Sequence, residues 1–297
     1  MLERMRLASL VLVMAMTTSA HAESPALAIL KNAIAHERDP KVLADSLVEV
    51  DKILAANAKD PDAHYARGWL LSRTGKGEDA VVEYDKALAL DPKLADAAYN
   101  AGVVLGSLNK DKEAIAHFDK ALAIDPKHVD AAYNAGQGYY NLKDFRHAAE
   151  RWATASKLAP DDFQIAKKVV QAEHAMGGDA TAARDRVFAL WKAGKAGTAK
   201  DYVFDQFDVG AHHIYAYETF DPSGDLAYVY RFSVTDHDKP LGSVNVETSA
   251  VIREQGLPYL LGMDKGGTHS QLGKVWKKLP TYKELKPLVV DAIKAKF

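Results

Sequence analysis

Histidines are the most reactive side chains in this sequence, because the chain contains no cysteine. His212 and His213 are adjacent, and His237 precedes Asp238. Neighbouring side chains on a strand point to opposite faces, so His212 and His213 cannot both bind one metal ion. One of the two histidines could still bind a metal ion together with His237 and Asp238, and this is the alternative to the expectation that follows. Solvated or hydrogen-bonded histidines are the expectation, and we predict no metal site.

Strings that would indicate catalysis are absent or have a structural explanation. Ser107 and Lys110 match Ser-x-x-Lys, but both lie within a repeated unit that explains them. The sequence has no His-Glu-x-x-His, no Gly-x-Ser-x-Gly, no P-loop and no dinucleotide-binding glycine pattern. We therefore expect no catalytic residues, no cofactor and no enzymatic activity. The alternative is an uncharacterised enzyme or small-ligand-binding domain within residues 197–297, to which the preceding repeats recruit a substrate.

A 34-residue unit occurs three times without a gap, in residues 61–94, 95–128 and 129–162. Five positions keep their spacing, occupied by a glycine, an alanine, an aromatic residue, a second alanine and a proline. These residues are Gly68, Gly102 and Gly136; Ala80, Ala114 and Ala148; Tyr84, Phe118 and Trp152; Ala87, Ala121 and Ala155; Pro92, Pro126 and Pro160. Glycine inside a helix costs about 1 kcal/mol relative to alanine, so its recurrence indicates close approach of a neighbouring helix. We interpret all these positions as scaffold.

The unit resembles the tetratricopeptide repeat (TPR) family, whose units are helix–turn–helix pairs of this length. The resemblance implies an all-α solenoid. Among members of the family, the chain resembles the exported bacterial TPR proteins. Asp51-Lys52 precedes Asp85-Lys86 by 34 residues, so the first segment keeps the phase. We interpret residues 25–60 and 163–196 as diverged capping pairs, since terminal repeats must tolerate solvent. The predicted solenoid spans residues 23–196.

TPR stacks use the first helix of each pair to line a concave groove, and the resemblance implies such a groove here. The stripe at helical spacing contains a ladder of tyrosines with polar neighbours: Tyr65, Trp69, Tyr99, Asn100, Tyr133, Asn134 and Gln137. Asparagine offers donors and acceptors, and tyrosine adds flat contact area, so we predict that a peptide or protein binds there. The alternative is that Tyr-Asn before the glycine is ordinary TPR consensus.

Aspartates begin the same three stripes, at Asp62, Asp96 and Asp130. Acidic residues in the first turn of a helix are favoured by the helix dipole. That explanation is preferred, and direct contact with a ligand is the alternative.

After residue 196 the period changes from that of a helix to an alternation of two. An alternating run predicts a strand at residues 226–234. We predict further strands at residues 214–220, 243–248, 258–263 and 268–277. Thr281 and Glu284 form a capping box for a last helix. We predict that residues 197–297 form an α+β domain, with a mostly antiparallel sheet and a C-terminal helix. It is not assigned to a characterised family.

The first residues have the pattern of a secretory signal peptide. Arg4 and Arg6 precede an apolar run over residues 7–16, and Ala20-His21-Ala22 offers a small-x-small cleavage site. The apolar run is shorter than the roughly 20 residues that span a bilayer, and an uncleaved anchor is the alternative. We predict cleavage after Ala22 and a periplasmic or secreted protein of a Gram-negative bacterium, with no later transmembrane segment.

Charge also limits the partners. The net charge is −2, with no clustered positive surface to indicate nucleic acid binding. We expect a protein or peptide partner, and self-association through the groove is a further possibility.

Overall fold

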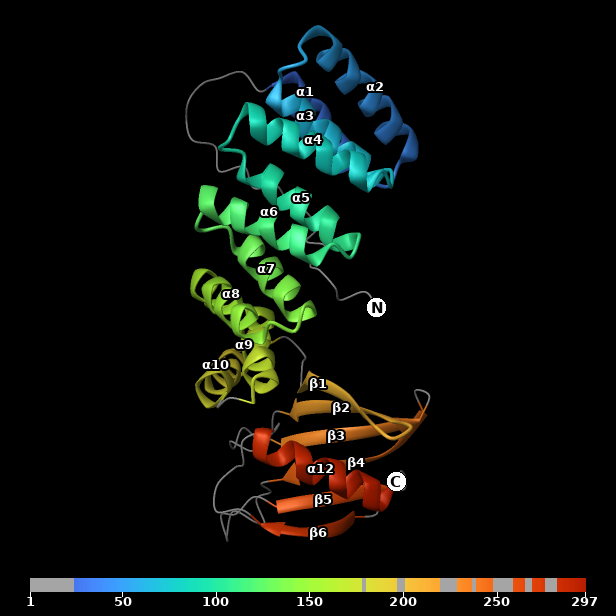
Figure 1. Cartoon of the computed structure of the whole chain (residues 1–297), viewed down its shortest axis with the longest axis vertical. Helices are drawn as coiled ribbons and strands as arrows, with labels where there is room; N and C mark the ends of the chain where they lie inside the picture. The colour runs from blue at the N-terminus through green and yellow to red at the C-terminus, as the bar shows by residue number, and fades with distance from the viewer. Residues whose placement is uncertain are drawn as a thin grey trace. The chain divides into compact units, whose positions relative to one another are not determined.

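The computed structural model describes residues 24–177, 180–196, 201–219, 229–236, 239–247, 259–264, 269–275 and 282–297. Within them, ten helices precede six strands and a last helix (Figure 1). Contacts divide the chain into two compact units, Met1–Leu158 and Ala159–Phe297. The predicted signal peptide lies outside the described residues.

The first unit is a stack of helix pairs. Its helices are α1 (Pro25–Ala35), α2 (Pro40–Ala56), α3 (Pro61–Arg73), α4 (Gly77–Leu90), α5 (Ala95–Ser107), α6 (Asp111–Ile124), α7 (Val129–Asn141) and α8 (Phe145–Leu158). Consecutive helices pack against one another, and so do the first helices of neighbouring pairs. Asp39 and Asp60 cap the helices that begin with Pro40 and Pro61, where proline suits the first turn. The predicted helical solenoid is confirmed.

Each clear repeat closes where its glycine meets the aromatic side chain of the same pair. A Cβ atom added to the glycine would come within 3 Å of the ring. The three pairs are Gly68–Tyr84 (2.8 Å), Gly102–Phe118 (2.6 Å) and Gly136–Trp152 (2.5 Å). The aromatic rings are buried, as are the alanines beside them. Glycine is therefore required in the first helix because the ring of the second helix occupies the space.

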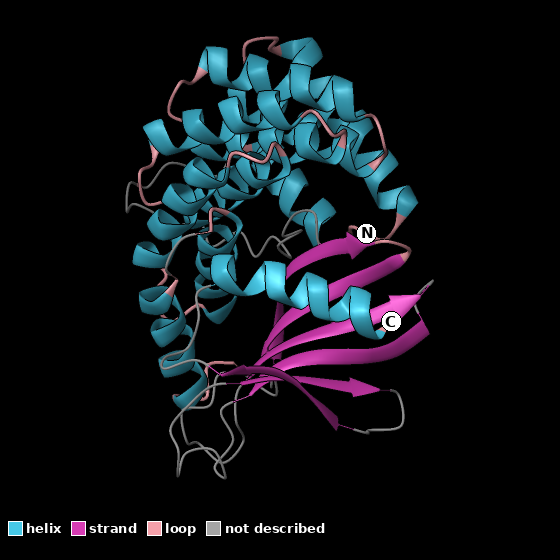
Figure 2. Ribbon diagram, turned by 60° about the horizontal axis from the view of Figure 1, so that its bottom comes forward, coloured by secondary structure: helices cyan, strands magenta, loops and turns pink. Residues whose placement is uncertain are grey.

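The second unit begins with two further helices and continues with a sheet and a last helix. Its elements are α9 (Phe163–Ala175), α10 (Thr181–Lys192), β1 (Asp201–Val209), β2 (His212–Thr219), β3 (Val229–Asp236), β4 (Lys239–Glu247), β5 (Tyr259–Asp264), β6 (His269–Val275) and α12 (Tyr282–Lys296). The six strands pair antiparallel in chain order. Figure 2 shows α12 lying across one face of the sheet. The predicted α+β architecture is confirmed.

Strand register explains which side chains form the core of this unit. Ala216 lies opposite Phe232, which lies opposite Val244, and all three are buried. Leu285 and Val289 of α12 belong to the same core. Pro287 lies inside α12, which nevertheless begins at Tyr282.

The sequence pattern did not single out β1. A bulge between Val203 and Asp205 shifts the register there, so the alternation is interrupted. The sequence also predicts a short helix at residues 250–255 and a hairpin turn at residues 264–267, and both segments lie largely outside the described residues.

The last two helices before the sheet keep the 34-residue phase but share its core. Phe163 and Val170 of α9 and Val187 of α10 belong to the hydrophobic cluster that contains Phe204 and Tyr230. The units divide after Leu158, whereas the phase of the repeats places the domain border between residues 196 and 197.

Candidate peptide-binding surface

The seven predicted groove residues lie on α3, α5 and α7, the first helices of the three clear pairs. Each has 7% or less of its surface exposed. The exposed fractions are 5% for Tyr65, 3% for Trp69, 5% for Tyr99, 7% for Asn100, 6% for Tyr133, 0% for Asn134 and 7% for Gln137. These residues therefore form the base of the stripe and do not project from it.

Hydrogen bonds join the tyrosine ladder across the repeats. Asn100 Nδ2 donates to the hydroxyl of Tyr65 at 3.0 Å, and Asn134 Nδ2 donates to the hydroxyl of Tyr99 at 3.2 Å. In both cases the asparagine belongs to the next pair. The Tyr-Asn combination thus connects consecutive repeats, in addition to any contact with a ligand.

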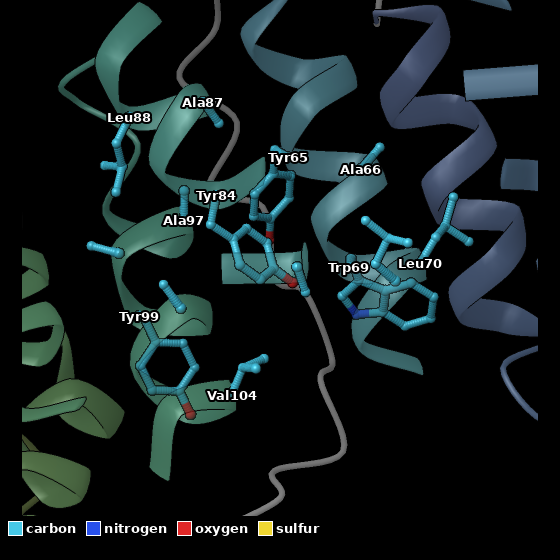
Figure 3. Packing of buried hydrophobic residues seen from close by; sticks show 14 of the residues in the cluster. Tyr65, Ala66, Trp69, Leu70, Tyr84, Ala87, Leu88, Ala97, Tyr99 and Val104 are labelled. Atoms are coloured by element: carbon cyan, nitrogen blue, oxygen red, sulfur yellow. The ribbon is translucent and has the colours of Figure 1, made fainter. Parts of the chain in front are cut away.

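The tyrosine rings also pack within their own repeats. Tyr65 lies 5.8 Å from Tyr84 between ring centroids, and Tyr99 lies 6.0 Å from Phe118 (Figure 3 shows Tyr65 beside Tyr84). Burial raises the pKa of Tyr65 well above its usual value, with smaller contributions from Tyr84 and Asp96. Tyr65 therefore stays protonated and acts through its hydroxyl and its ring.

A chain of side-chain amides runs along α7. Gln137 Nε2 donates to Asn141 Oδ1 at 3.0 Å, and Asn141 Nδ2 donates to Asp111 Oδ1 at 3.0 Å. Asn134 Oδ1 and Gln137 Oε1 are buried and have no hydrogen-bond partner. Asp111 is absent from the predicted site because it lies on α6; only the tertiary fold places it beside Asn141.

Cations on the first helices already have partners. Arg73 Nη2 lies 3.2 Å from Glu37, and its guanidinium lies 5.1 Å from the Trp69 ring. Arg67 pairs with Asp51 and Glu83. The sequences of α5 and α7 contain no lysine or arginine. These two helices therefore add no positive charge to the stripe.

The predicted aspartates stand at one end of the stripe. Burial raises the pKa of Asp62, and the nearby carboxylates of Asp60 and Asp91 add to the effect. Asp96 Oδ1 lies 3.6 Å from His128 Nε2.

Ser107, Lys110 and His213, which could have carried chemistry, have partners outside the stripe. Ser107 Oγ donates to the carbonyl of Val104 at 2.7 Å, and Lys110 Nζ lies 2.7 Å from Glu78. His213 Nδ1 lies 2.7 Å from Asp208 Oδ1, whereas His237 and Asp238 lie outside the described residues. Among the residues that the structure describes, no three metal-ligating side chains come together, and no helix is long and apolar enough to cross a membrane.

Comparisons with known proteins agree with this architecture. Two profiles of the tetratricopeptide repeat family match the sequence, one at residues 44–95 and 65–129 and the other at residues 112–172. No curated protein matches the sequence.

Solved structures with a similar fold share little sequence identity with this chain. A MamA crystal structure is 18% identical with a TM-score of 0.51, and the match covers 59% of this chain and 96% of that chain. MamA from Desulfovibrio magneticus RS-1 is 20% identical over 60% of this chain and 100% of that chain, with a TM-score of 0.49. YrrB, described as a TPR protein with an unusual peptide-binding site, is 18% identical over 56% and 94% of the two chains, with a TM-score of 0.45. The repeated helix pairs and the matching profiles show that residues 44–172 of this chain consist of tetratricopeptide repeats.

Proposed function

We propose that this protein is an exported, non-catalytic scaffold that binds a protein or peptide along the first helices of its repeats. The observation that carries the proposal is that some positions of the repeat are constant in type whereas a neighbouring position varies. The glycine and aromatic positions pack the pairs in all three copies. One residue after each glycine, the stripe instead holds Trp69, Val103 and Gln137. These three side chains differ in size and polarity at one position of the stripe, as expected if the stripe recognises a particular ligand.

Exposed positions on the stripe offer the sharpest test of this proposal. Tyr99 and Asn134 are bonded to each other, so replacing them would disturb the stack as well as binding. Ser107 follows Val103 by four residues, so it continues the stripe at the end of α5, and it is exposed. Ala116 is an exposed residue of the second helix α6. A photo-crosslinking amino acid at Ser107 is expected to capture a partner in intact cells, and the same group at Ala116 is the control.

The result would be read from the crosslinked products. A discrete product at Ser107 that is missing at Ala116 supports the groove. No product at Ser107, or the same products at both positions, contradicts it.

Export has its own test. N-terminal sequencing of the protein from a periplasmic fraction is expected to begin at Glu23. An N-terminus at Met1 in the membrane fraction would instead indicate an uncleaved anchor.

A further inference from the structure

The orientation of the Gln137 amide follows from its neighbours. A carboxylate can only accept hydrogen bonds, so Asp111 requires Asn141 to present its Nδ2. Asn141 Oδ1 then accepts from Gln137 Nε2. The atom of Gln137 that remains is therefore an oxygen, and it is buried without a hydrogen-bond partner. A group that satisfies it must be a donor.

Two further acceptors lie on the same face of α7. Asn134 precedes Gln137 by three residues and Asp130 precedes Asn134 by four, so the three share one side of the helix. Asn134 is fully buried, and its Oδ1 also has no hydrogen-bond partner. Asp130 is half-buried. We name Asp130, Asn134 and Gln137 the acceptor row.

Cationic donors that could serve the acceptor row are missing from the two helices that carry most of the stripe, α5 and α7. Neither α5 nor α7 contains a lysine or arginine, and Arg73 of α3 pairs with Glu37. A buried acceptor without a hydrogen bond is unfavourable, so a donor that reaches it gains stability. A ligand carboxylate would meet only acceptors there, and Asp130 would repel it.

We infer that the acceptor row binds an arginine side chain of an extended peptide. Arginine carries five N–H donors in a fixed plane and no acceptor, so one guanidinium can serve several oxygens. This inference rests on the proposed function, because it names the chemical class of the ligand of the same groove.

The test is selection of peptides from a random dodecapeptide library on the purified protein. The wild type is expected to enrich peptides that share an arginine. Replacing that arginine by alanine in one selected peptide is expected to weaken binding at least about tenfold, the effect of losing charge-assisted hydrogen bonds. The Gln137→Val substitution is expected to weaken binding of the parent peptide by a similar factor. It should weaken binding of the alanine-substituted peptide much less. Valine suits the position, since Val103 occupies it in the preceding repeat.

Each outcome separates the two proposals. Selected peptides without a basic residue, or with an acidic bias, overturn the arginine assignment. If a bulky Ser107→Trp substitution prevents these peptides from binding, the proposal of groove binding stands. Equal affinity of the wild type and Gln137→Val for an arginine peptide also overturns the assignment. Failure to enrich any peptide overturns the assignment and contradicts peptide binding itself.

Discussion

Aromatic rings enclose the imidazole of His174 in the core of the second unit. Its ring centroid lies 4.4 Å from that of Phe204 and 5.3 Å from that of Tyr282. Burial, with the charge of Arg184 acting in the same direction, lowers the pKa of His174 to about 3. The residue is therefore neutral in the folded protein at every ordinary pH.

Acid should destabilise the second unit through His174. The unfolded chain binds a proton near pH 6.5, whereas the folded chain binds it only near pH 3. Stability is therefore complete above pH 6.5 and falls on acidification through this window, by up to about 1.4 kcal/mol per pH unit. Urea denaturation at pH 7.5 and pH 4.5 should show a smaller difference for His174→Leu than for the wild type. Equal differences would show that another group titrates.

Gly102 tests how closely a helix pair must approach. Alanine would favour the helix by about 1 kcal/mol, but its Cβ would stand 2.6 Å from the Phe118 ring. Overpacking of this kind costs about 1–3 kcal/mol, so we expect Gly102→Ala to lower the free energy of unfolding. Urea denaturation measures the change. Adding Phe118→Leu should then cost less than it does alone, and additive effects would contradict the proposed clash.

At the scale of helices, charges join one repeat to the next. Asp119 of α6 pairs with Arg151 of α8 at 2.8 Å, and the equivalent residues one repeat earlier are Asp85 and His117. One repeat earlier still, the equivalent residues are Asp51 and Glu83. Both are acidic, so they cannot form an ion pair with each other.

Arg67 of α3 bridges these two carboxylates. Its Nε lies 2.7 Å from Asp51 and its Nη1 lies 3.1 Å from Glu83. His64 Nδ1 lies 2.6 Å from Glu83 Oε2, and Lys86 Nζ lies 2.8 Å from Glu83 Oε1, the oxygen that Arg67 also contacts. Burial opposes the charge of Glu83, but hydrogen bonds from Lys86 and His64 and the charge of Arg67 outweigh it and lower the pKa.

Removing the bridge should therefore loosen the first repeat. We expect Arg67→Ala to lower the free energy of unfolding by about 1.5–3 kcal/mol, because the buried Glu83 loses a charged partner. The combination His64→Ala, Arg67→Ala and Glu83→Arg copies the later junction, where alanines accompany Arg151. It should be more stable than Arg67→Ala alone in urea denaturation. If it is less stable, the junctions are not interchangeable.

At the scale of the whole molecule, a truncation tests where independent folding ends. A chain ending at residue 196 keeps α9 and α10 but loses Phe204 and Tyr230 from their shared core. We expect hydrogen exchange to show α3 to α8 protected in this fragment and α9 and α10 largely unprotected. A fragment ending at Leu158 should retain the same protection in α3 to α8. Full protection of α9 and α10 would instead support a border between residues 196 and 197.

Periodic features were predictable because each depends on a rule that recurs along the chain. The glycine, aromatic and proline positions, which begin with Gly68, Tyr84 and Pro92, recur every 34 residues. They recur because every helix pair must pack and turn in the same way. The alternation of residues 226–234 predicts β3, and it reflects the buried face that holds Tyr230, Phe232 and Val234. Strand β1 was not predicted, because its bulge interrupts the alternation.

The sequence by itself therefore determined the helical repeat, the change to a sheet and the stripe on which a ligand is predicted to bind. Only the tertiary structure decided the partner of each buried polar atom. Asn100 reaches Tyr65 and Asn141 reaches Asp111 across helices that are distant along the chain. The same holds for the core that α9 and α10 share with the sheet. Periodicity reports which face of an element is buried, whereas the distance between two atoms on different elements depends on how those elements pack.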